Sequence, residues 1–193
     1  ADLHVTAGFR PLDHFMVTLT ANPPGAGVLT GAGTYYEGET ITVTAEAHYG
    51  YVFNNWSLDN TVLSDEAVLQ LGITEDISLT AHFTPRQYDI SVTVMPDGAG
   101  TVSGAGTHPY GKEVELEAVP SEGYVFASWM EGGEVVGTAE QVTVLVESDR
   151  RLEAHFEKKT YTVLYDAAPG GYLSGETKQR VYHEENGSAV EAI

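Results

Sequence analysis

The chain has 193 residues, no cysteine and a formal net charge of −19 at pH 7. Without cysteine it has neither disulfides nor thiolate metal ligands. Its charge excludes a basic patch that could neutralise nucleic-acid phosphates or adsorb to anionic lipid. No apolar run approaches the roughly 18 residues that a membrane-spanning helix needs.

The sequence repeats itself. Residues 88–156 align with residues 15–83 at a constant offset of 73, without a gap, and about a third of the aligned positions are identical. The identical positions are mostly Gly, aromatic or small apolar residues, which form turns and cores. The repeat therefore predicts a copied fold unit and not a copied reaction centre, so function is sought first in the array.

The period predicts four segments. We expect the closing strand of a preceding repeat plus a joint at 1–13, a first full repeat at 14–85, a second full repeat at 86–158, and the first half of a third, divergent repeat at 159–193. Residues 5–9 match the closing segment of a repeat, and residues 161–163 open a new one. The parent protein is therefore expected to extend in both directions.

Alternation with period two predicts strands throughout the repeat, with no helix of useful length. In the first repeat, strands are expected at 16–20, 28–30, 40–45, 51–56, 67–73 and 77–83. The spacing of three between Phe53 and Trp56 breaks the alternation and predicts a β-bulge near Asn54 and Asn55 that turns both rings inward.

One strand shows which face is exposed to water. Ile41, Val43 and Ala45 share a face, and the threonines that alternate with them are replaced by glutamates in the second repeat. A sheet with one wet face is typical of antiparallel pairing. The fold class expected is all-β, with tandem small antiparallel β-sheet repeat domains of about 70 residues.

The third segment differs from the first two repeats. Its glycine hairpin at 170–175 comes about two residues early, and Asn186-Gly187 adds a good hairpin signal. The segment lacks the Phe/Trp strand and so cannot complete a core alone. It is expected to pack on the second repeat, to pair with another chain, or to be flexible.

Charge is distributed unevenly along the chain. Residues 15–83 contain eight acidic residues and no Lys or Arg, whereas four of the nine basic residues, Arg10, Arg86, Lys158 and Lys159, lie in the short joints. One interpretation is that the charge keeps a crowded surface protein soluble. The other is that the joint cations rest on the acidic flank of a neighbouring repeat of the same chain and restrict bending.

The pattern Gly-Tyr-Val-Phe-x-x-Trp at 50–56 and 123–129, in register with Ala-His-Phe at 81–83 and 154–156, resembles the divergent internalin-type B-repeat family of bacterial surface proteins. The resemblance implies a long extracellular protein attached to the cell wall, with such units in tandem. In related internalin repeats the unit is β-grasp-like, but no helix signal occurs here, so an all-β unit is expected. The family has no catalytic residues to transfer.

Two groups of aromatic side chains have different expected roles. Large rings at matching positions are expected to form the core of each repeat: Phe53, Trp56, Phe83, Phe126, Trp129 and Phe156. Tyr35, Tyr36, His108 and Tyr110 lie in turns and are the candidates for ligand contact. The alternative for these four residues is that they cover a sheet edge.

No pattern for cofactor, zinc or EF-hand calcium binding occurs, and no catalytic motif is present. Glu75-Asp76 and Ser148-Asp149 fill the same turn, where an acid stabilises the turn itself or contributes to a weak calcium site. We therefore expect a protein without enzymatic activity, cofactor or metal. The expected function is a spacer that projects another domain from the cell; the alternative is an adhesin-type module that recognises a host protein or glycan through turn aromatics or an acidic face.

Overall fold

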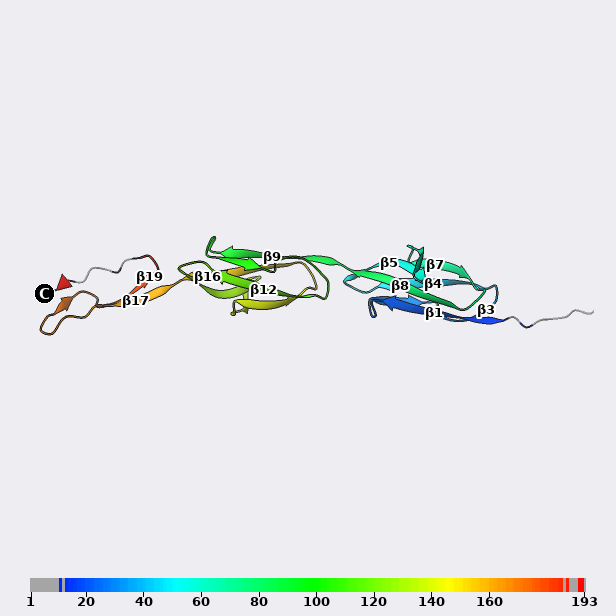
Figure 1. Ribbon diagram of the computed structural model, residues 1–193, viewed down its shortest axis with the longest axis horizontal. Helices are drawn as coiled ribbons and strands as arrows, with labels where there is room; N and C mark the ends of the chain where they lie inside the picture. Colours follow the sequence, from blue (N-terminus) through cyan, green and yellow to red (C-terminus); the bar gives the residue numbers. More distant parts are fainter. Residues whose placement is uncertain (1–10, 12, 186, 188–190, 193) are drawn as a thin grey trace, which may run out of the picture. The chain divides into compact units, whose positions relative to one another are not determined.

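The computed structural model describes residues 11, 13–185, 187 and 191–192 (Figure 1). No helix occurs among these residues, and the all-β prediction is confirmed. The chain divides between Arg86 and Gln87 into two compact units, which are described one at a time. Most of the closing strand expected at 1–13 lies outside the described residues.

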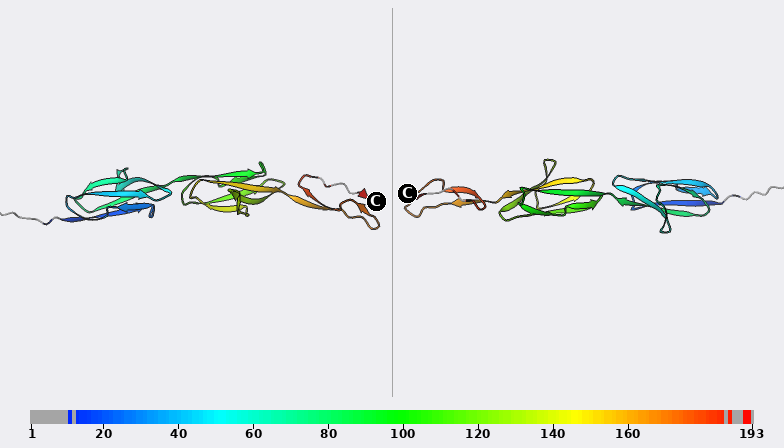
Figure 2. Two further views of the ribbon diagram at one scale, coloured as in Figure 1. Left: turned by 180° about the vertical axis from the view of Figure 1, so that it is seen from behind. Right: turned by 90° about the horizontal axis from the view of Figure 1, so that it is seen from above.

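The described part of the first unit contains eight strands in two sheets (Figures 1 and 2). A five-stranded sheet has the order β3-β1-β8-β5-β6, and a three-stranded sheet has the order β2-β4-β7. The strands are β1 (His14–Asn22), β2 (Gly27–Thr30), β3 (Gly33–Tyr36), β4 (Thr40–Ala47), β5 (Tyr51–Leu58), β6 (Thr61–Ser64), β7 (Val68–Gly72) and β8 (Ile77–Pro85).

The second repeat reproduces this topology, with sheets ordered β11-β9-β16-β13-β14 and β10-β12-β15. Its strands are β9 (Gln87–Met95), β10 (Gly100–Ser103), β11 (Gly106–Pro109), β12 (Glu113–Pro120), β13 (Tyr124–Glu131), β14 (Glu134–Gly137), β15 (Gln141–Leu145) and β16 (Arg150–Lys158). The third segment follows with β17 (Thr160–Leu164), β18 (Leu173–Ser174), β19 (Lys178–Tyr182) and β20 (Glu191–Ala192).

The first and last strands of each repeat pair in parallel, a feature that the expected antiparallel sheets did not include. β1 lies beside β8 from Val17↔Ile77 to Asn22↔His82, and β9 pairs with β16 in the same way. All other strand pairs among the described residues are antiparallel. Parallel strands need a long connection, and here the whole of β2 to β7 supplies it.

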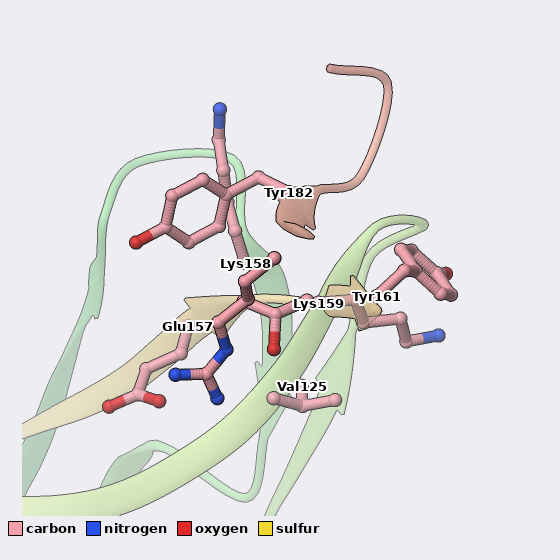
Figure 3. Close-up of a pocket in the computed structure, with 8 residues that line it drawn as sticks. Val125, Glu157, Lys158, Lys159, Tyr161 and Tyr182 are labelled. Atoms are coloured by element: carbon pink, nitrogen blue, oxygen red, sulfur yellow. The ribbon is translucent and has the colours of Figure 1, made fainter. Parts of the chain in front are cut away.

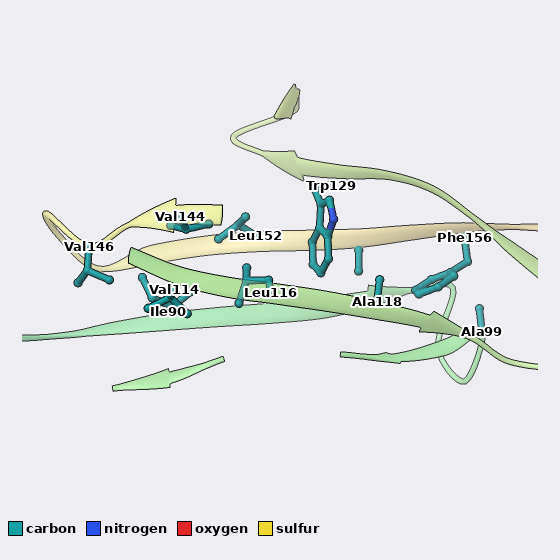
Figure 4. Packing of buried hydrophobic residues seen from close by; sticks show 11 residues of the cluster. Ile90, Ala99, Val114, Leu116, Ala118, Trp129, Val144, Val146, Leu152 and Phe156 are labelled. Atoms are coloured by element: carbon teal, nitrogen blue, oxygen red, sulfur yellow. The ribbon is translucent and has the colours of Figure 1, made fainter. Parts of the chain in front are cut away.

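Each repeat has its own core between its two sheets. In the second repeat, Trp129 is fully buried and lies among Leu116, Ala118 and Phe156 (Figure 4). The first repeat builds the same core around Trp56, with Val43 and Phe83. The alternating apolar residues of β4 and β12 face inward, and the threonines or glutamates between them are mostly exposed.

The predicted bulge is present in both repeats. The pairing of β5 with β8 shifts register between Phe53 and Asn55, and the pairing of β13 with β16 shifts between Phe126 and Ser128. The extra residue turns Phe53 toward Trp56, so that the ring centroids lie 5.9 Å apart. The corresponding distance in the second repeat is 5.3 Å. The structure thus places all six predicted core rings in or against the core of their repeat.

The acidic turn before the last strand also has the same role in both repeats. The Asp76 carboxylate accepts a hydrogen bond from the backbone N–H of Met16 at 2.7 Å, and Asp149 accepts one from Asp89 N–H at 2.8 Å. Each carboxylate therefore extends the parallel strand pair by one side-chain hydrogen bond. This contact accounts for the acid at this position without a metal ion.

The third segment contains no buried apolar side chain among its described residues. It is held to the second repeat at the joint, where Lys159 N–H donates to Gly123 O at 2.7 Å. Within the segment, His183 N–H donates to Lys159 O at 2.9 Å. The His183 ring packs against Gly123 so closely that a Cβ there would collide with it. Of the three expectations for this segment, the structure shows packing on the second repeat. The Asn186 half of the predicted hairpin lies outside the described residues.

Candidate binding groove

A groove of about 810 Å³ lies where the second repeat meets the third segment (Figure 3). It is open to solvent, and two strands of the second repeat and two of the third segment contribute its walls. Its lining combines cations, hydroxyl groups and apolar surface from Val125, Glu157, Lys158, Lys159, Thr160, Tyr161, Arg180 and Tyr182.

The joint hydrogen bonds position these side chains. Because Lys159 is bonded to Gly123 on one side and to His183 on the other, the end of β19 is fixed beside the end of β16. β19 carries Arg180 and Tyr182, and their alternation with Val181 places both on the same face. Tyr161 also lines the groove, and the centroid of its ring lies 6.1 Å from that of the His183 ring.

The groove concentrates positive charge in an acidic chain. Three of its lining residues are basic, whereas the whole chain has nine Lys and Arg against 28 Asp and Glu. Lys158 also approaches Glu185 of the third segment at 3.9 Å, an exposed pair of small energetic value. Only one acid, Glu157, lines the groove. The arrangement therefore suits an anionic ligand with apolar ring faces.

The prediction that the ligand-contact residues lie in turns is correct for Tyr110 alone, because Tyr35 and Tyr36 belong to β3 and His108 belongs to β11. Tyr35 and His108 also make a local hydrogen bond. The Tyr35 hydroxyl donates to Gly31 O at 3.0 Å, and His108 Nε2 lies 2.9 Å from Gly104 O. Tyr35 and His108 occupy equivalent positions, so two different side chains make the same hydrogen bond to the glycine hairpin. Tyr35 additionally borders a shallow hollow of about 380 Å³.

The other two predicted residues lie against neighbouring rings. Tyr36 is half exposed and has an edge contact with His14 at 5.6 Å between centroids, and Tyr110 has one with Tyr88 at 6.4 Å. Tyr35 and Tyr36 belong to the first unit, whereas His108 and Tyr110 belong to the second. The four residues therefore do not form one site within either unit. The sequence did not predict the groove, because its lining comes from three separate segments: Val125, residues 157–161 and the two side chains of β19.

A polar cluster in the first repeat was also missed. His82 is half-buried: its Nε2 lies 2.8 Å from Ser57 Oγ, and its Nδ1 lies 3.4 Å from Asn22 Nδ2. The matching positions of Ser57 and Asn22 in the second repeat are methionines, Met130 and Met95. The cluster therefore has no copy in the second repeat.

Within the described ranges, no group of three or more His, Asp or Glu side chains is placed to hold a metal ion. Over the same residues, no helix is both long and apolar enough to cross a bilayer.

One ion pair distinguishes the two repeats. Arg150 Nε donates to Glu131 Oε1 at 2.9 Å, and its Nη2 donates to the other carboxylate oxygen. The hydrogen bonds from Arg150 lower the pKa of Glu131 below its ordinary value of 4.5, and the same bonds raise the pKa of Arg150. The first repeat has Leu58 and Ile77 at these positions.

This pair predicts a pH-dependent difference in stability. Because the folded-state pKa of Glu131 is lowered, the contribution is complete above the unfolded value of 4.5 and is lost as the pH falls through the lower folded value. For a partly exposed pair we expect less than about 1 kcal/mol. The denaturation midpoint of the second repeat should exceed that of Glu131→Gln at pH 6, and the difference should shrink as the pH falls below 4.5. A difference that stays constant with pH would contradict this prediction.

The fold and its chemistry define a class of protein: a tandem array of small two-sheet β repeats whose shared residues build turns and cores. Sequence comparison then gives the family. The chain belongs to the divergent InlB B-repeat domain family, whose family model matches residues 17–87 and 90–160. Repeats of this family are typical of bacterial surface proteins and are typically non-catalytic.

Other comparisons add little. A search of the curated proteins found no match. Among solved structures, the chain is similar to the Bacillus anthracis TIE protein at 12% identity and a TM-score of 0.40, with 94% of this chain and 43% of that protein covered. The chain thus spans less than half of that protein's length. A likeness at this level transfers neither fold nor function.

Proposed function

We propose that this chain is a non-catalytic, extracellular spacer segment of a bacterial surface protein, which projects another domain from the cell. The observation that carries the proposal is the parallel pairing of the first and last strands of each repeat. Because these strands run in the same direction, the chain enters a repeat at one end of the strand pair and leaves at the other. Each repeat therefore advances the chain instead of returning it to its starting point.

The register gives the advance per repeat. The chain takes eight residue steps along β1 from His14 to Asn22, which is level with His82, and three more to Pro85. At about 3.3 Å per residue, these eleven steps span about 36 Å. A single residue, Arg86, separates β8 from β9, so the joint contributes little to the number of residues in each repeat.

Small-angle scattering on chains with two, four and six copies of the repeat tests the spacer. The maximum dimension should increase by roughly 36 Å for each added repeat. An increase of less than half this value would mean that the repeats fold back on one another, and the spacer proposal would fail. Arg86→Glu in the two-copy chain tests the separate proposal that joint cations limit bending, which requires a change in the scattering profile at low salt.

A second candidate function is binding, which the groove favours. Cations beside two exposed tyrosines suit an acidic glycan, whose carboxylates pair with Lys158, Lys159 and Arg180 while its ring faces lie on Tyr161 and Tyr182. This candidate keeps the adhesin alternative but moves the contact from the predicted turn aromatics to the joint.

An array of sialylated and uronic-acid glycans tests the groove. Binding should be saturable, should weaken with salt, and should fall at least tenfold in Lys158→Gln/Arg180→Gln, a loss of about 1.4 kcal/mol. Lys112→Gln, which removes a cation elsewhere in the same unit, is the matched control and should leave binding unchanged. If the array shows no binding, the groove has no role in glycan recognition. If binding is abolished instead by Tyr35→Ala or Tyr110→Ala, the turn aromatics are the site.

A further inference from the structure

Tension along the chain would act on one pair of strands in each repeat. A force applied at the two ends of the first repeat pulls β1 toward its start and β8 toward its end. These strands are neighbours and parallel, with six residue pairs in register from Val17↔Ile77 to Asn22↔His82. The force therefore drives the two strands past each other along their shared axis (Figure 1).

This direction of loading determines how the hydrogen bonds fail. Backbone hydrogen bonds of a parallel pair run across the strands, so sliding the strands strains every bond of the ladder together. Pulling two strands apart from one end instead breaks the bonds one after another, and each rupture needs less force. The second repeat has the same geometry from Ile90↔Arg150 to Met95↔His155.

The surrounding structure reinforces this pair. On its other side, β8 is bonded to β5 from Tyr51↔Pro85 to Leu58↔Leu79, so it cannot slide alone. The carboxylate of Asp76, directly before β8, holds Met16 N–H of β1. Beneath the ladder, Val17 and Leu79 are buried and keep water from the bonds on that face.

The rest of each repeat lies inside the loop that this pair closes. Residues 23–76 connect Asn22 to Ile77, so tension reaches them only after β1 and β8 separate. The repeat should consequently resist as a whole and then release its length at once.

We propose that the paired strands β1 and β8, and likewise β9 and β16, form a mechanical clamp, so that each repeat resists tension applied through the chain. The clamp deepens the spacer proposal, since a spacer between a cell and an attached domain carries any force between them. The two proposals fail separately. Scattering measures length without force, and the clamp is tested by the direction of force.

The absence of cysteine allows the pulling points to be chosen in the full chain. Asp13→Cys/Arg86→Cys places two exposed handles at opposite ends of the clamp, and Asp13→Cys/Glu75→Cys places two exposed handles at the same end. Denaturant midpoints of the two variants should agree, so that any difference in force reflects direction alone. Forced unfolding is governed by the unfolding rate, so both are compared at one pulling speed.

The lengthwise variant should unfold at a force several-fold higher than the same-end variant. When the unmodified chain is pulled from its termini, each complete repeat should release its length in one step. That step is roughly 200–220 Å, from about 3.3–3.6 Å per residue over 14–85 less the folded span. Equal forces in the two directions would overturn the clamp. It would also be overturned if residues 23–76 yielded in small steps before the main event.

Discussion

Replacing Trp129 with alanine is expected to unfold the second repeat while the first repeat remains folded. Trp129 is fully buried between the two sheets, and its Nε1 donates to Ala139 O at 2.9 Å. Removing a buried Trp costs about 3–5 kcal/mol, because the apolar contacts are lost and a cavity remains. A unit of about 70 residues rarely has more than that in total. The first repeat has a separate core and should be unaffected.

The chain reports on this experiment by itself, since it has only two tryptophans, one in each repeat. In Trp129→Ala, the urea unfolding transition followed by Trp56 fluorescence should be unchanged. The amplitude of the unfolding transition followed by circular dichroism should fall by about half, because only the first repeat still unfolds cooperatively. Trp56→Ala is the mirror variant and should give the opposite pattern. Val135→Ala, which trims an exposed side chain of the second repeat, should change neither signal. Simultaneous unfolding of both repeats would show that their cores are coupled.

Gly104→Ala is expected to destabilise the second repeat by about 2–4 kcal/mol, because strain from the backbone conformation and steric overlap add. Gly104 has φ +88°, a conformation that side-chain-bearing residues rarely adopt. A Cβ at this position would also collide with the backbone carbonyl of Glu115 and would lie 3.2 Å from Leu116 Cδ2. Backbone of a paired strand cannot move aside without losing its ladder. Gly31 has the same environment in the first repeat.

Gly98 provides the matched control, since it lies in the same repeat with φ +75° and a methyl group added to its Cα would meet no atom within 4 Å. Gly98→Ala should therefore lower the free energy of unfolding only through the strain of the positive φ, by about 1 kcal/mol. Urea titrations of both variants, followed by Trp129 fluorescence in a Trp56→Phe background, measure the difference. Equal destabilisation by the two substitutions would refute the close approach at Gly104.

Local patterns in the sequence predict much of the repeat. Alternation around Val43 places the strand and its buried face, and the Phe53–Trp56 spacing places the bulge, because both depend on neighbouring residues. The β5–β6 hairpin was not predicted, although Gly132-Gly133 at the matching tip of the second repeat is a typical turn pair. Asp59 and Asn60, the matching residues of the first repeat, also have positive φ. The glycine pair is the local signal that could have placed this hairpin in both repeats.

Other features depend on residues that the chain brings together from a distance. The parallel pair joins Val17 to Ile77, and no local pattern specifies which strand becomes the neighbour of β1. The groove needs Lys158 and Arg180 on one surface, which the pairing of β17 with β19 and the joint hydrogen bonds of Lys159 produce. The half-buried state of His82 has a similar origin, because the alternation puts it on the outer face but cannot reveal that Ser57 lies beside it.

The β5–β6 and β13–β14 hairpins have a consequence for how such arrays diversify. Among the described residues, β6 and β14 are edge strands, each paired only with the strand before it, and they lie outside the pairs that join the first and last strands. Their tips already differ between the repeats, with Asp59-Asn60 in one and Gly132-Gly133 in the other. Insertions are tolerated best at such exposed tips. Natural insertions, or peptides grafted by design, can therefore change the surface of one repeat at this tip while its two sheets keep their strand order.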